Sequence, residues 1–127
     1  MLTDRGVEAA VRSLIQRAPV PVDFRTAVPV RVDATIEAAG YFLVSEALTN
    51  IAKYAQATSV SVELELAGDT LVVTIADDGL GGADPKRGSG LRGLVDRVQA
   101  VGGHLEISSP LGHGTRLRAE LPTSPLG

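Results

Sequence analysis

The chain has 127 residues, 44% of them apolar and only 3% aromatic, so a single compact domain with an aliphatic core is expected. Its net charge of −3 argues against a general nucleic-acid binder, which needs a basic face, but leaves room for a locally positive nucleotide pocket. The absence of cysteine excludes disulfides, thiolate metal sites and cysteine nucleophiles. With no apolar run near the ~20 residues of a membrane helix and no secretory signal, we expect a cytoplasmic chain that makes no membrane contact itself, alone or as part of a membrane-bound receptor.

The first predicted element is a helix over residues 4–18, where apolar side chains recur at helical spacing and two prolines follow. A strand is expected over residues 20–28. Asp33 is the expected N-cap of a long helix over residues 34–55. That helix carries two apolar stripes, which predict that it is largely buried.

The second half of the chain begins with a period of two. Residues 60–66 alternate between apolar and polar, and a Gly68-Asp69 turn joins them to an apolar strand over 71–76. Residues 77–90 are rich in glycine, aspartate and proline and predict a loop. The last predicted elements are a helix over residues 91–101 and two strands over 104–108 and 115–121.

Strands that come in adjacent pairs predict the fold class. The expected fold is a two-layer α/β (α+β) sandwich, with a mixed, mostly antiparallel sheet and the helices on one face. A doubly wound nucleotide fold is not expected, because strands and helices do not alternate throughout.

The first segment with chemical potential is SEALTNIAKYA, in which Glu46, Asn50 and Lys53 recur at spacings of four and three, on one face of the long helix. Glu46 is the only formal charge between Glu37 and Lys53, and a carboxylate in an apolar helix is costly without a partner. Paired with a carboxamide, it suits a water and a hard divalent cation. A solvated stripe on an amphipathic helix explains the pattern equally well.

The second segment is IADDGLGG, where an apolar strand runs into acids and glycines. Asp77 at the strand end suits a hydrogen bond from an exocyclic amine, and glycines let the backbone approach a flat ring. An ordinary acidic turn is the alternative.

The third segment, GSGLRGL over residues 88–94, opens a helix with glycines and is flanked by Lys86, Arg87 and Arg92. Free backbone N–H groups at a helix start favour phosphate. The segment lacks the Gly-Lys-Ser/Thr of a Walker loop and does not follow a strand as a dinucleotide fingerprint does. Helix capping alone is the alternative. A fourth segment, GHGT, predicts a hairpin turn in which Thr115 adds a hydroxyl to a pocket.

The order of the four segments resembles the GHKL ATPase superfamily of gyrase, the heat-shock chaperone, histidine kinases and mismatch-repair ATPases, over residues 33–122. EALTNIAKYA is similar to the N box of histidine kinases. GSGLRGLVDRV is similar to the second glycine box of the subfamily that works with nitrate-type response regulators. Residues 2–11 look like the segment that joins that subfamily's phosphoacceptor and ATPase domains. The resemblance implies a linker helix over 1–18, an ATP-binding catalytic domain over 19–122 and a frayed tail over 123–127.

The resemblance also implies residue roles, with ATP and Mg²⁺ as cofactors. Asn50 would bind the metal, Glu46 would support catalysis through a metal-bound water, and Lys53 would lie near the phosphates. Asp77 would accept from the adenine amino group, with Thr115 supporting it through an ordered water. The other implied nucleotide-binding positions are Gly79, Gly81, Gly88, Gly90, Leu91 and Arg92.

The implied function is transfer of the γ-phosphoryl group to a histidine on a separate helical domain of the same protein, and from there indirectly to a response regulator. The intact protein is expected to be a homodimer, the present chain a monomer, and Met1 a boundary within a longer protein. His104 and His113 are expected to be surface residues, not the acceptor. Tyr54 departs from the family, which often has histidine there. The alternatives are a stand-alone serine kinase that inactivates a sigma factor, a degenerate interaction domain without ATP binding, and a gyrase-type subunit.

Overall fold

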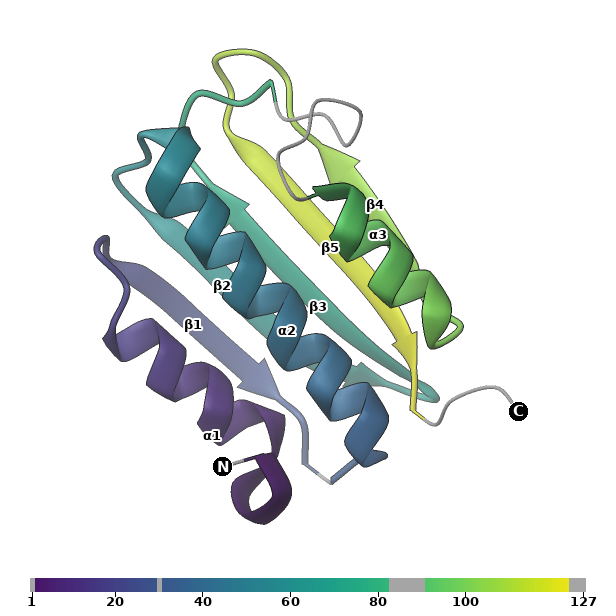
Figure 1. The fold of residues 1–127 in the computed structure, drawn as a ribbon. Coiled ribbons are helices and arrows are strands. Elements are labelled where there is room, and N and C mark those ends of the chain that lie inside the picture. The colour runs from purple at the N-terminus through teal and green to yellow at the C-terminus, as the bar shows by residue number, and fades with distance from the viewer. Residues whose placement is uncertain (1, 30, 83–90, 124–127) are drawn as a thin grey trace.

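The computed structural model describes residues 2–29, 31–82 and 91–123. Within them three α-helices lie side by side on one face of a five-stranded sheet (Figure 1). The elements are α1 (Leu2–Gln16), β1 (Val22–Ala27), α2 (Ala34–Asn50), the π-helical turn η1 (Ile51–Ala55), β2 (Val60–Ala67), β3 (Thr70–Asp77), α3 (Leu91–Ala100), β4 (His104–Ser108) and β5 (Thr115–Pro122).

The sheet has the order β1-β2-β3-β5-β4. Strands β1 and β2 are parallel because α2 crosses between them, whereas every other neighbouring pair is antiparallel. The predicted two-layer sandwich with a mixed, mostly antiparallel sheet is therefore confirmed.

The core lies between the sheet and the helices, and it is aliphatic as the composition predicts. On β2, Val60, Val62 and Leu64 are buried under the helices, whereas the alternating residues Glu63 and Glu65 face the open side. This period of two explains why the strand was predictable from its pattern. No helix among the described residues is long and apolar enough to cross a membrane.

Helix α1 belongs to this core, because Val7, Ala10 and Val11 are buried. It differs from the predicted helix over residues 4–18 in ending at Gln16 and in a break at Gly6, which has φ 80° and ψ −179°. Its role as a linker from a phosphoacceptor domain stays a prediction.

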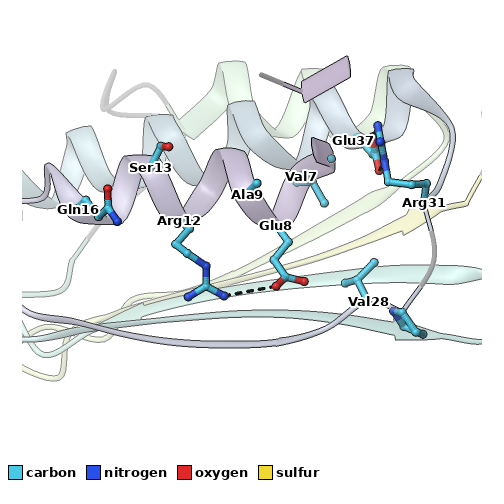
Figure 2. A pocket seen from close by; sticks show the side chains of 11 residues that line it. Val7, Glu8, Ala9, Arg12, Ser13, Gln16, Val28, Arg31 and Glu37 are labelled. Atoms are coloured by element: carbon cyan, nitrogen blue, oxygen red, sulfur yellow. Dashed lines mark hydrogen bonds and ion pairs between the residues drawn. The ribbon is translucent and has the colours of Figure 1, made fainter. Parts of the chain in front are cut away.

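A buried ion pair sits where α2 begins. Glu37 is only 1% exposed, and its two carboxylate oxygens accept from the Arg31 guanidinium at 2.7 and 2.9 Å. Figure 2 shows the two side chains meeting at the end of a groove of about 520 Å³ that runs along α1, with the Arg12–Glu8 ion pair on its wall. The Arg31 side chain also packs against Gly6, where a Cβ would lie 2.8 Å from the guanidinium Nε. The pair thus ties the break in α1 to the start of α2.

Two further boundaries differ from expectation. The helix predicted over residues 34–55 is α-helical only to Asn50 and then becomes a π-helical turn. Thr123, expected in a frayed tail, donates its N–H to the Asp69 carbonyl at 2.9 Å and accepts from Asp33 N–H at 3.2 Å. The rest of the expected tail lies outside the described residues.

Candidate functional site

Three segments far apart in the sequence meet at one end of the sheet. The end of α2, the end of β3 and the turn between β4 and β5 all lie there (Figure 1). In the strand register, Asp77 at the end of β3 is opposite Val60 on one side and Thr115 on the other. The structure therefore brings the second and fourth sequence segments into contact and places the first beside them.

Asp77 is a half-buried carboxylate with a defined orientation. Its Oδ1 accepts from the Gly79 N–H at 2.8 Å. Burial is the main influence on its pKa and raises it, while the N–H groups of Gly79 and Thr115 act in the opposite direction and the nearby Asp78 charge adds to the rise. A carboxylate held in this way at a strand end is a fixed acceptor for a ligand donor.

The segment after Asp77 packs directly on the β4–β5 turn. Gly81 has φ 68° and Gly114 has φ 75°, and a Cβ on either would overlap a backbone carbonyl oxygen, that of Pro110 for Gly81 and that of Asp77 for Gly114. The Gly82 N–H donates to the Ser109 carbonyl and the Gly112 N–H to the Leu80 carbonyl, both at 2.7 Å. Only glycine permits this close approach. The sequence pattern predicted a close approach of the backbone to a ligand ring at Gly81, and it did not predict the contact between these two segments.

Thr115 reaches Asp77 by a route that the sequence did not predict. Its backbone N–H lies at the Asp77 carboxylate. Its hydroxyl is 2.6 Å from that of Ser109, a residue that the sequence pattern did not single out. The ordered water expected between Thr115 and Asp77 stays a prediction.

The end of α2 carries a polar group with an unused hydrogen-bonding capacity. The Nδ2 of Asn50 is buried and has no hydrogen-bond partner among the described residues. Glu46, one turn earlier, is half-buried, whereas Lys53 is exposed on η1. A π-helical turn holds more residues than an α-helical one, so Lys53 is shifted from the face that an unbroken α-helix would give it.

Asp78 is a residue that the sequence interpretation missed. Its carboxylate accepts from the N–H groups of Thr58 and Ser59, at 2.8 and 3.0 Å, and from their hydroxyls, at 2.5 and 3.2 Å. These donors hold the pKa of Asp78 well below its ordinary value. The available signal was the paired aspartate after a strand together with the Thr58-Ser59 pair before the neighbouring strand.

The third segment is described only in part, because Gly88 and Gly90 lie outside the described residues. Leu91 is buried at the start of α3, so its side chain contributes to the core and only its backbone is available to a ligand. Arg92 is exposed and pairs with Asp96 at 3.5 Å. His104 and His113 are exposed, as predicted.

Comparison with known proteins shows which family the chain belongs to. Residues 36–125 match the family described as "Histidine kinase-, DNA gyrase B-, and HSP90-like ATPase". Over 130 residues the chain is 36% identical to the "Oxygen sensor histidine kinase NreB" of Staphylococcus carnosus, covering 95% of this chain and 38% of that relative.

Solved structures give the same picture. The histidine kinase domain of the blue-light activated histidine kinase from Erythrobacter litoralis superposes with a TM-score of 0.68 at 29% identity, over 91% of this chain and 57% of that one. The histidine kinase AdeS of Acinetobacter baumannii has a TM-score of 0.67 at 17% identity, over 92% of this chain and 61% of that one, which is a likeness of fold alone.

Proposed function

Because this chain belongs to the family of histidine kinase-, DNA gyrase B- and HSP90-like ATPases, we propose that it is the ATP-binding catalytic domain of a sensor histidine kinase. The observation that carries the proposal is the joint presence, at one end of the sheet, of the fixed Asp77 carboxylate and the Asn50 side chain, whose buried Nδ2 has no hydrogen-bond partner in the described part of the chain. The chain spans 38% of the length of its curated relative. That the whole protein also has a domain that senses a signal and a domain that accepts the phosphoryl group is therefore part of the proposal.

Asp77 is the proposed adenine-recognising residue. Its carboxylate accepts from the adenine amino group while Gly79 holds its other side. Gly81 keeps the backbone close to the β4–β5 turn, and Thr115 supports Asp77 from β5. A half-buried acceptor of this kind selects a base with an exocyclic donor, because an unpaired carboxylate would be costly there.

Asn50 is the proposed metal ligand, and the site suits Mg²⁺. The buried Nδ2 of Asn50 has no partner among the described residues, so an acceptor on the ligand, such as a phosphate oxygen or a water, would satisfy it. The Oδ1 of the same carboxamide would be the metal ligand, because Mg²⁺ takes few protein oxygens together with waters and phosphates. When bound, the metal would neutralise charge on the phosphates. Glu46 lies one turn away and would orient a water, and Lys53 would approach the phosphates from η1.

The start of α3 is the proposed phosphate end of the site. Gly88 and Gly90, proposed on the sequence pattern, would let the chain fold over the phosphates, and Arg92 would add positive charge. Burial of Leu91 anchors the first turn of α3, whose free N–H groups favour an anion.

The proposed reaction moves the γ-phosphoryl group from ATP to an imidazole nitrogen. The bond to the β-phosphate oxygen breaks, a P–N bond forms, and ADP leaves. This domain positions the nucleotide and its charges, which is most of what phosphoryl transfer requires of a protein. The acceptor lies on a separate helical domain of a cytoplasmic, homodimeric protein that passes the group to a response regulator.

The test is transfer from labelled ATP to the acceptor domain of the intact protein, added as a separate polypeptide. We expect acid-labile, base-stable label on that domain, as for a phosphohistidine. Acid-stable label on a serine of another protein would favour the sigma-factor serine kinase. Calorimetry showing no ATP binding at millimolar nucleotide would favour the degenerate domain.

A further inference from the structure

Asp78 joins two parts of the candidate site that are 20 residues apart in the sequence. Its carboxylate accepts four hydrogen bonds from Thr58 and Ser59, which precede β2. The backbone follows the same path, since the Asp78 N–H donates to the Ser59 carbonyl at 3.4 Å. The carboxylate therefore fastens the entry to β2 onto the exit from β3.

The segment that Asp78 fastens is the continuation of α2 beyond Asn50. It consists of the π-helical turn η1 and then Gln56, which has φ 53°. π-Helical turns are rare and occur mainly at functional sites, and a left-handed conformation is unfavourable for a non-glycine residue. Such a segment does not hold its shape by local preference. Its conformation is fixed at one end by α2 and at the other by the bonds from Asp78.

Asp78 directly follows Asp77, so the same two residues serve both sides of the site. The Asp77 carboxylate accepts from the Gly79 N–H, whereas the Asp78 carboxylate accepts from Thr58 and Ser59 before β2. We propose that Asp78 is a positioning residue that holds η1, and with it Asn50 and Lys53, in register with Asp77, so that one nucleotide engages both ends of the site together. This inference rests on the proposed ATP site.

The charge state of Asp78 is consistent with this role. Four donors hold its pKa well below the ordinary range, so the carboxylate is ionised and accepts hydrogen bonds at neutral pH. Asparagine in its place keeps an oxygen for the two N–H groups and presents an NH₂ group to the two hydroxyls, which then accept. Alanine removes every one of these bonds.

The experiment compares Asp78→Ala and Asp78→Asn with wild type and with Glu65→Ala, which removes an exposed carboxylate from β2 at a distance from the site. The first measurement is amide hydrogen exchange over residues 51–59 without nucleotide. The second is calorimetric affinity for ATP with and without Mg²⁺, and for ADP without Mg²⁺. Thermal unfolding of all four proteins accompanies both.

We expect Asp78→Ala to lose protection from hydrogen exchange over residues 51–59. Its affinity for Mg²⁺-ATP should fall on the order of tenfold, because the groups that bind the phosphates and the metal would no longer be correctly placed. Its affinity for metal-free ADP should stay within about twofold, the usual effect of an exposed substitution. Asp78→Asn and Glu65→Ala should resemble wild type in both measurements.

The outcomes separate the inference from the proposed function. If wild type binds no ATP, both are wrong. If wild type binds Mg²⁺-ATP and Asp78→Ala binds it equally well, the inference is wrong and the proposed function stands. If Asp78→Ala loses metal-free ADP binding and melting temperature in proportion, or Asp78→Asn fails to restore protection, the residue is merely structural and the inference is again wrong.

Discussion

At the scale of single residues, two adjacent aspartates have opposite environments. Burial raises the pKa of Asp77, whereas four donors lower that of Asp78. The unfavourable environment belongs to the residue proposed to bind a ligand, and the favourable one to the residue that holds the backbone. Free Asp77 therefore costs stability that a bound adenine amino group would restore.

Asp77→Asn should separate binding from stability. The carboxamide can present a donor to the adenine amine, and an unsatisfied polar group there should lower ATP affinity on the order of tenfold. An aspartate with a raised pKa stabilises the fold below its ordinary value of 3.8 and loses that contribution as pH rises through the folded value. Asparagine does not ionise, so the variant does not lose stability in this way as pH rises. The difference in melting temperature between variant and wild type should therefore favour the variant more at pH 7 than at pH 3. Unchanged ATP affinity by calorimetry would remove Asp77 from the site.

Asn50→Ala should abolish most of the gain in ATP affinity that Mg²⁺ brings, because the proposed metal ligand is gone. Adenosine binding should be preserved, since Asp77 is untouched. Stability should change little or increase, because the variant removes a buried donor without a partner in the described part of the chain. Calorimetry with and without Mg²⁺, with a thermal melt, measures all three. A large drop in melting temperature would mean that Asn50 is structural.

At the scale of elements, the turn between β4 and β5 matters as much as the strands that it joins. Gly112 and Gly114 both have positive φ, at 80° and 75°, but only Gly114 lies against Asp77. A side chain at Gly112 would meet no atom within 4 Å. Alanine substitutions at the two positions can therefore distinguish two effects. Both substitutions force alanine into a left-handed conformation, but only the one at Gly114 would also displace the end of β3.

Gly112→Ala should destabilise the protein by about 1–2 kcal/mol, the cost of a left-handed alanine, and leave ATP affinity near that of wild type. Gly114→Ala should cost more and should also weaken ATP binding, because the new Cβ must push the end of β3 away. Urea unfolding and calorimetry on the pair measure this. Equal effects of the two substitutions on affinity would show that the close approach at Gly114 does not shape the site.

At the scale of the whole molecule, what was predictable followed from local patterns. Alternation located β2 to within one residue, and Asp33 was recognised as the N-cap of α2, where it accepts from the Thr35 N–H at 2.9 Å. The break at Gly6, the π-helical turn after Asn50 and the bonds of Asp78 escaped prediction. Gly6 lies against Arg31, and Asp78 accepts from Thr58 and Ser59, so two of these features involve residues distant in the sequence. Apolar periodicity indicates which side of an element is buried but not which residues it contacts.

The same limit explains why Glu46, and not Glu37, was chosen as the carboxylate in need of a partner. Glu46 stands alone in an apolar stretch, yet it is half-buried near the end of α2. Glu37, close to the polar start of the helix, is almost completely buried and is neutralised by Arg31. Burial of Glu37 results from α1 packing over the start of α2, which no pattern within α2 reports.

The Arg31–Glu37 pair should connect α1 to the rest of the molecule energetically. Arg31→Ala leaves the almost completely buried Glu37 carboxylate without its cation, whereas Glu37→Gln leaves an Arg31 side chain that is 48% exposed and can be hydrated. Arg31→Ala should therefore be the more destabilising, by up to about 3 kcal/mol once the partial exposure is allowed for. Because Arg31 also packs on Gly6, cleavage of α1 by a protease should be faster in Arg31→Ala than in Glu37→Gln. Combining the two changes should recover part of the loss, with a coupling of about 1–3 kcal/mol in urea unfolding; additive effects and unchanged cleavage of α1 would mean that the pair does not hold the helix in place.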